Sequence, residues 1–146
     1  MSVSVSYDPR YLAGVLLFNA QDYFAAHEVW EDLWAESHGL ERPFYQGLIQ
    51  AAVGLCHFGN GNLGGAVKLY HSSKAYMARC GSPFLGLEVA DFWQRMALCF
   101  APLLGPEPPP RSTRPNPELL PVIRLHPEPQ DWPNPEDHVH EEDDTP

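Results

Sequence analysis

The stretch that decides the fold is FAAHEVWEDLW, residues 24–34, whose apolar residues recur at the spacing of an α-helix. Residues three, four and seven positions apart share a face when successive residues turn by about 100°. One face of this helix therefore collects three aromatic side chains and one imidazole: Tyr23, His27, Trp30 and Trp34. Glu31 follows His27 by four residues and lies at the edge of the same face. The stretch predicts a helix over about 22–37 that buries its aromatic face and turns His27 inward.

The same helical spacing extends through the first 105 residues, and no strict alternation of apolar and polar residues interrupts it. The expected helices cover about 9–18, 22–37, 42–58, 63–80 and 87–103. Asp8 is expected to cap the first helix and Asn62 the fourth, because both residue types accept backbone N–H bonds at helix starts. Short connections favour antiparallel neighbours. The sequence therefore predicts an all-α fold, a compact antiparallel bundle of about five helices.

The last part of the chain differs in composition from the rest. Residues 106–146 hold 12 of the 16 prolines, and their three Lys plus Arg against ten Asp plus Glu give a charge of −7 out of a total of −10. Such a segment can neither propagate a helix nor bury much apolar surface. We therefore expect a helical domain over 1–105 and an extended, proline-rich, acidic tail over 106–146. The tail should pack on the bundle near 118–125 and be mobile elsewhere.

Charge and cysteine content argue against several classes of protein. A net charge of −10 without a Lys/Arg-rich stripe argues against a nucleic acid or an anionic membrane as partner. The three cysteines show no CxxC spacing, so neither a disulfide framework nor a zinc knuckle is indicated. The first residues lack the pattern of a secretion signal, and the longest uncharged run, 43–67, is too polar for a membrane span. We expect a cytoplasmic protein.

A row of polar residues on the third expected helix gives an independent indication of a site. Gln46, Gln50 and His57 lie with Val53 on one line of a helix that is otherwise almost entirely apolar. An unpaired buried amide or imidazole costs about 1 to 3 kcal/mol, so this row should face polar groups of the preceding helix. We therefore expect a polar cluster between the two helices, with two further residues at its rim: His27, Glu31, Gln50 and His57, with Glu28 and Gln46 at the rim.

Three interpretations of this cluster are open. It could be a hydrogen-bond network that fixes the register of the two helices. It could be a pocket lined by Tyr23, Trp30 and Trp34, in which carboxylate and imidazole bind a small ligand or act as acid and base. It could also hold a transition metal, although HEVWE matches neither HExxH nor the Glu-x-x-His of di-iron bundles. The two tryptophans fit core packing better than ligand stacking.

Three motifs, in this order, resemble DUF309, a bacterial and archaeal family of domains of unknown function: LFNAQDYFAAHEVWEDLW (17–34), ERPFYQGLIQAAVGLCHF (41–58) and NLGGAVKL (62–69). The resemblance covers about residues 8–104 and implies a small all-helical domain without an assigned activity. It also implies that the family signature includes Phe18, Asn19, His27, Glu28, Trp30, Glu31, Trp34, Gln46, Gly47, Gln50, His57, Asn62, Gly65 and Ala66. Gln21 stands where the family often has Gly, and Ala25 where it often has Glu. The tail lies outside the pattern.

We therefore expect an uncharacterised helical domain that acts as a binding or assembly module. The alternative is an enzyme, of hydrolase or metal-dependent type, that uses His27 and Glu31 as acid and base or as ligands. The sequence does not identify a cofactor, and the metal interpretation stays open. The pocket could take a small molecule, and exposed aromatic side chains of the first or fifth helix could pair two subunits in a homodimer. The histidine- and acid-rich segment 138–144 is expected to be solvated.

Overall fold

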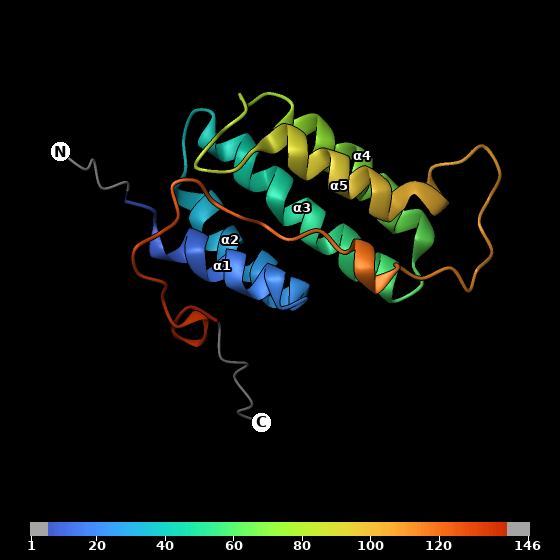
Figure 1. The fold of residues 1–146 in the computed structure, drawn as a ribbon, viewed down its shortest axis with the longest axis horizontal. Helices are drawn as coiled ribbons and strands as arrows, with labels where there is room; N and C mark the ends of the chain where they lie inside the picture. The colour runs from blue at the N-terminus through green and yellow to red at the C-terminus, as the bar shows by residue number, and fades with distance from the viewer. Residues whose placement is uncertain (1–5, 140–146) are drawn as a thin grey trace.

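The computed structural model describes residues 6–139, and five α-helices dominate it (Figure 1). These are α1 (Pro9–Asn19), α2 (Tyr23–Glu36), α3 (Glu41–Gly59), α4 (Leu63–Met77) and α5 (Val89–Phe100), with three short 3-10 helices, η1 (Ala101–Leu103), η2 (Pro117–Leu119) and η3 (Pro135–Asp137). The all-α class and the five-helix arrangement predicted from the sequence are confirmed. Within the described residues no helix is long and apolar enough to cross a membrane.

The helices begin at residues that satisfy their first N–H groups. The carboxylate of Asp8 accepts a hydrogen bond from the backbone N–H of Arg10 (2.9 Å), and Pro9 occupies the first position of α1. Asn62 has the same role at α4, where its Oδ1 accepts from the N–H of Gly65 (3.1 Å). Both caps therefore do what their residue types predict.

The turn from α1 to α2 requires an unusual backbone conformation. Gln21 has a φ of 66°, in the left-handed region that glycine adopts without steric cost. Gln21, which stands where the family often has Gly, therefore adopts a backbone conformation that glycine would adopt without strain. Gly39, in the connection from α2 to α3, has a φ of 60°, and as a glycine it adopts this conformation without steric cost.

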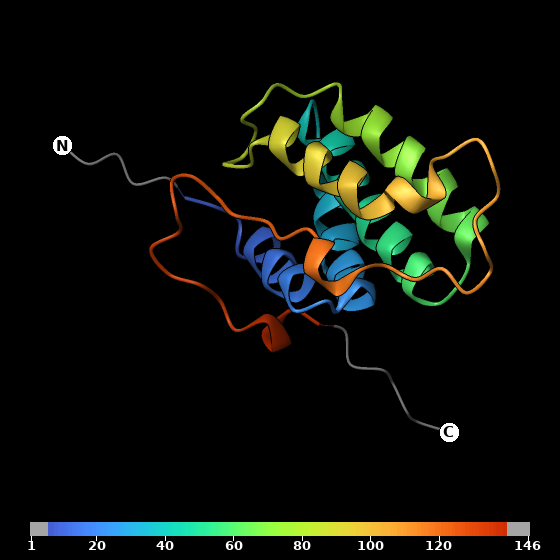
Figure 2. The ribbon, with the colours of Figure 1, turned by 45° about the vertical axis from the view of Figure 1, so that its right-hand side comes forward.

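The longest helix, α3, runs through the centre of the bundle. Both views show α1 and α2 on one side of it and α4 and α5 on the other (Figures 1 and 2). The side chains of Phe44, Leu48 and Phe58 on α3 are fully buried. Close contact with α4 is possible because Gly47 has no side chain. A Cβ at this position would lie only 2.2 Å from Met77. The Ser73 hydroxyl of α4 donates to the carbonyl of the same Gly47 (2.5 Å).

Trp30 is part of the core rather than of a surface site. Its side chain is fully buried, and its indole N–H donates to the carbonyl of Tyr11 in α1 (3.2 Å). A Cβ at Gly14 would lie 1.9 Å from that indole nitrogen, so the absence of a side chain there lets the ring lie against α1. Tyr23 also faces α1, with its ring 5.3 Å from that of Phe18. The aromatic face of α2 therefore holds α1 and α2 together.

The tail lies along the bundle between α1 and α5 (Figures 1 and 2). Ile123 and Leu125 are 2% and 4% exposed, while Val122 and Arg124, each of which precedes one of them, are exposed. This alternation is typical of an extended segment on an apolar surface. Further contacts follow at 127 and 135–137, where the Tyr7 hydroxyl donates to the carbonyl of Pro127 (2.6 Å) and η3 lies against α1. The division into two units at residue 105 stays a prediction. The expected solvated segment 138–144 lies outside the described residues from 140 onward.

Candidate functional site

A hollow opens where the ends of α2 and α4 meet the beginning of α3. Its volume is about 320 Å³, which is within the range of small-molecule sites. Six residues line it: Trp34, Arg42, Pro43, Gln46, Tyr76 and Arg79. We call it the interhelical hollow. Two guanidinium groups, two aromatic rings and one amide give it a chemistry suited to a polar ligand.

Arg42 is held in place by the end of α2. Its guanidinium lies over the ring of Trp34, 4.0 Å from the ring centre, which is a cation–π contact. One of its terminal nitrogens also lies 3.4 Å from the carbonyl oxygens of Trp34 and Ser37. These contacts position the charged group at the wall of the interhelical hollow.

Arg79, just beyond the end of α4, also lines the interhelical hollow and also lies against an aromatic ring. Its guanidinium lies 5.2 Å from the ring centre of Tyr76, which precedes it by three residues. No ion pair joins Arg79 or Arg42 to a carboxylate in the part of the chain that the structure describes. By contrast, Arg10 contacts Asp8 (3.1 Å) and Glu36 (2.9 Å), so the carboxylate of Glu36 at the end of α2 is already engaged.

His27 and Glu31 form a pair on α2. The Nδ1 of His27 hydrogen-bonds the carbonyl oxygen of Phe24, and because a carbonyl only accepts, this nitrogen carries the proton. The other ring nitrogen, Nε2, lies 3.7 Å from a carboxylate oxygen of Glu31, whose side chain is 56% exposed. The contact becomes an ion pair only when the imidazole is protonated. A long, exposed pair of this kind adds less than about 1 kcal/mol to stability.

Gln50 has the most unusual environment of the predicted residues. Its Oε1 is buried and has no hydrogen-bond partner among residues 6–139. Trp34 and Pro43 line the same hollow, and α2 and α3 are antiparallel. Seven residues along each helix, about 10 Å, lead from Trp34 back to His27 and from Pro43 forward to Gln50. This register predicts that Gln50 lies at about the height of His27, one turn beyond Gln46 of the interhelical hollow.

His57 belongs to a different local structure, the turn from α3 to α4. Its Nδ1 lies 3.4 Å from the side-chain nitrogen of Asn62, and the N–H of Asn62 donates to its carbonyl (2.9 Å). The imidazole thus supports the residue that caps α4. It has no hydrogen bond to His27, Glu31 or Gln50 in the described part of the chain.

Within residues 6–139, hydrogen bonds and ion pairs do not link the four residues of the predicted cluster into one network. His27 contacts Glu31, His57 contacts Asn62, Gln46 lines the interhelical hollow, and Gln50 lacks a partner for its oxygen. Of the three aromatic residues expected as lining, Trp34 lines the interhelical hollow, whereas Tyr23 and Trp30 pack towards α1. Between residues 6 and 139 no group of three or more His, Cys, Asp or Glu could hold a metal ion. Glu28 is half-buried.

Arg42 and Arg79 are the residues that sequence reasoning missed. The spacing of Tyr76 and Arg79 would allow a ring and a guanidinium to meet on a helical turn, so that contact had a local signal. The contact between Arg42 and Trp34 crosses the connection from α2 to α3 and has no such signal. Only the packing of α3 between α2 and α4 brings the two arginines to one hollow.

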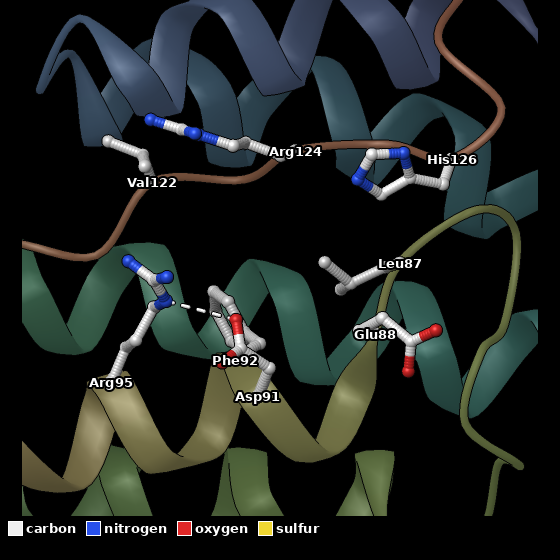
Figure 3. A pocket seen from close by; sticks show the side chains of 8 residues that line it. All are labelled: Leu87, Glu88, Asp91, Phe92, Arg95, Val122, Arg124 and His126. Carbon is white, nitrogen blue, oxygen red and sulfur yellow. Dashed lines mark hydrogen bonds and ion pairs between the residues drawn. The ribbon is translucent and has the colours of Figure 1, made fainter.

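A second hollow, of about 260 Å³, lies between α5 and the tail (Figure 3). Figure 3 shows Arg124 and His126 of the tail across from the α5 side chains. The charged groups on the α5 side already have partners: Arg95 pairs with Asp91 (3.0 Å), and Glu88 accepts from the Ser82 hydroxyl (3.2 Å). This second hollow therefore has fewer charged side chains without a partner than the interhelical hollow, where neither Arg42 nor Arg79 has an ion pair within residues 6–139.

Two of the three cysteines, Cys80 and Cys99, are poor candidates for a reactive site. Burial raises the pKa of Cys99 to about 11, and it raises the pKa of Cys80 as well. A thiol nucleophile needs the opposite shift, because only the thiolate reacts. Neither thiol is therefore activated for chemistry near neutral pH.

Comparison with known proteins adds the family. Residues 11–69 match the family model of DUF309, a domain of unknown function. The resemblance predicted from the sequence is confirmed. The DUF309 match spans α1 to the first half of α4 and includes every residue named above as part of the signature, whereas α5 and the tail lie beyond it. Arg42 lies inside the matched range and Arg79 outside it.

An uncharacterized protein of Aquifex aeolicus (strain VF5) is similar to part of this chain. The two sequences are 31% identical over 75 residues, which make up 51% of this chain and 22% of the relative. The match thus spans about a fifth of the relative's length. Neither the DUF309 family nor this relative has an assigned activity in its description.

Proposed function

We propose that this DUF309 chain is a small-molecule binding module whose ligand occupies the interhelical hollow and extends along α3 to Gln50. The observation that carries the proposal is the buried Oε1 of Gln50, which has no hydrogen-bond donor in residues 6–139. A buried acceptor without a donor costs about 1 to 3 kcal/mol. A ligand that donates a hydrogen bond to this oxygen would remove the cost.

The neighbouring groups support a ligand of mixed polarity. Gln46 lies one turn from Gln50 on the same line of α3 and lines the interhelical hollow. A ligand N–H or O–H directed at Gln50 would satisfy its oxygen, while the rings of Trp34 and Tyr76 offer apolar walls. His27 and Glu31, expected at about the height of Gln50, would contact the same end of the ligand.

A binding role is better supported than the enzymatic alternative. In the described residues no third His, Cys, Asp or Glu joins His27 and Glu31 to form a group that could hold a metal. Their contact is long, and the carboxylate faces solvent. The two residues can therefore orient a ligand, but nothing in their surroundings favours acid–base work.

The replacement of Gln50 by leucine tests this proposal. If the row serves a ligand, Gln50→Leu removes an unsatisfied buried oxygen and should raise the free energy of unfolding by about 1 kcal/mol. The same change should abolish chemical-shift changes at Gln46 and His27 when the protein is titrated with a library of small polar compounds. Gln94→Leu, at an exposed position of α5, is the control and should leave both results unchanged.

Two outcomes would overturn the proposal. A loss of stability of about 2 kcal/mol or more in Gln50→Leu would mean that the amide serves a structural network. A wild-type protein whose groups near Gln46 and Gln50 respond to no compound in the library would mean that the hollow binds no ligand of this kind.

A further inference from the structure

We infer that the ligand carries a phosphate monoester, whose phosphate group is bound between Arg42 and Arg79. This inference rests on the proposed function, because it names the chemical class of the molecule that occupies the interhelical hollow. It starts from two arginines, Arg42 and Arg79, that line the same hollow from the beginning of α3 and the end of α4.

The first step of the argument concerns charge. The chain has a net charge of −10, with nine Lys plus Arg against 19 Asp plus Glu, so two arginines that line one hollow form a local exception to its negative charge. Yet neither Arg42 nor Arg79 has an acidic partner within the described residues, although Arg10 and Arg95 do. Two neighbouring cations without counter-ions repel each other, and an anion between them removes that cost.

The second step concerns the orientation of the two groups. Each guanidinium lies against an aromatic ring, Arg42 at 4.0 Å from the centre of Trp34 and Arg79 at 5.2 Å from that of Tyr76. A ring covers one face of a guanidinium and leaves its edge open; one terminal nitrogen of Arg42 donates to the carbonyls of Trp34 and Ser37, which leaves the other terminal nitrogen and Nε for a ligand. Such a stacked, oriented fork binds the oxygens of phosphate in bidentate fashion.

The third step selects a phosphate monoester over other anions. A phosphate monoester carries a charge of about −1.5 to −2 at neutral pH, which matches two guanidinium groups better than a single carboxylate does. The volume of about 320 Å³ exceeds what an inorganic phosphate fills, so the remaining space would hold the rest of the molecule. The acidic chain disfavours an anionic membrane surface as the source of the phosphate.

The test is a titration of the full chain with phenyl phosphate at low ionic strength, followed by calorimetry and proton–nitrogen correlation NMR. Inorganic phosphate and benzoate serve as comparison ligands, since one lacks the organic group and the other carries a single charge. Phenyl phosphate should bind more tightly than both, should shift the indole signal of Trp34, and should weaken as salt is added.

Three arginine variants show where the phosphate binds. Arg42→Gln and Arg79→Gln should each weaken binding of phenyl phosphate by about 10- to 100-fold, the loss of one charge-assisted contact. Arg42→Lys keeps the charge but loses the fork and should also weaken it. The matched control is Arg95→Gln, whose guanidinium pairs with Asp91 outside the interhelical hollow, and it should bind as the wild type does.

The outcomes separate this inference from the proposed function. If phenyl phosphate fails to bind, or binds equally well to Arg42→Gln and Arg79→Gln, the inference is wrong. If uncharged compounds still shift the signals of Gln46 and Gln50 in that case, the binding function stands without a phosphate. If inorganic phosphate binds as tightly as phenyl phosphate, the site recognises the free ion, and the monoester is excluded as the preferred ligand.

Discussion

The Asn19 side chain and the backbone of Ile123 form a two-bond pair that joins the end of α1 to the tail. The N–H of Ile123 donates to Asn19 Oδ1 (2.7 Å), and the Asn19 side-chain nitrogen donates to the carbonyl of Ile123 (2.9 Å). An asparagine is suited to this contact because its amide offers one acceptor and one donor, as a neighbouring strand would. The residue thereby fixes the register of the extended segment on the bundle.

Asn19→Ala should release the tail from α1. The change removes both bonds and leaves the N–H and carbonyl of Ile123 without their partners, so we expect a loss of about 1 to 3 kcal/mol in the free energy of unfolding. Cleavage by trypsin after the exposed Arg124 should become faster, because proteolysis follows local opening. Gln94→Ala, which removes an exposed amide from α5, should change neither. Equal trypsin resistance in Asn19→Ala and the wild type would contradict this role.

Gly14→Ala should destabilise the contact between α1 and α2. Its Cβ would lie 1.9 Å from the indole nitrogen of Trp30, so the ring must move and its bond to the Tyr11 carbonyl must lengthen or break. Overpacking of this kind costs about 1 to 3 kcal/mol, measurable by urea unfolding. Gly64→Ala is the matched control, because nothing lies within 4 Å of its added Cβ in α4. That variant should gain up to about 1 kcal/mol through helix propensity.

The architecture could be predicted because its main signals are local. The helical spacing around His27, the caps at Asp8 and Asn62, and the glycine at the end of α2 each lie within a few residues of what they determine. The pair of Asn19 with Ile123 could not be predicted in this way. It joins segments far apart in the sequence, and its hydrogen bonds go to the backbone, which carries no sequence signal.

The candidate site was predictable only in part, for the same reason. The contact of His27 with Glu31 follows from their spacing of four residues on one helix, whereas the contact of His57 with Asn62 depends on the turn from α3 to α4. Arg42 and Arg79 share a hollow because α3 packs between α2 and α4. Their proximity results from helix packing, and neither the sequence around Arg42 nor the sequence around Arg79 contains a pattern that predicts it.

Gln21→Gly should stabilise the protein. The residue has a φ of 66°, which costs a residue with a Cβ about 1 to 2 kcal/mol, while glycine adds about 0.5 to 1 kcal/mol of unfolded-state entropy. The balance predicts a gain of about 0.5 to 1 kcal/mol by urea unfolding. Gln94→Gly in the middle of α5 should instead lose about 1 kcal/mol, since that position is helical. The idea fails if both variants lose stability.

Cys99 should make the fold sensitive to alkaline pH. Burial raises the pKa of its thiol to about 11 in the folded state, so the folded protein keeps a proton that the unfolded chain releases at lower pH. The stability linked to this group is therefore complete below the ordinary thiol pKa and is lost as pH rises towards 11. At most, the loss amounts to about 2 to 3 kcal/mol.

Comparison of Cys99→Ala with the wild type measures this effect. The variant loses some packing at every pH, but its free energy of unfolding should fall less between about pH 8 and about pH 10.5, because the titrating group is gone. Urea unfolding at both pH values gives the difference. Cys56→Ala, at a half-exposed position, controls for the loss of a thiol as such and should lose stability with pH as the wild type does. Parallel losses in Cys99→Ala and the wild type would show that burial does not keep this thiol protonated.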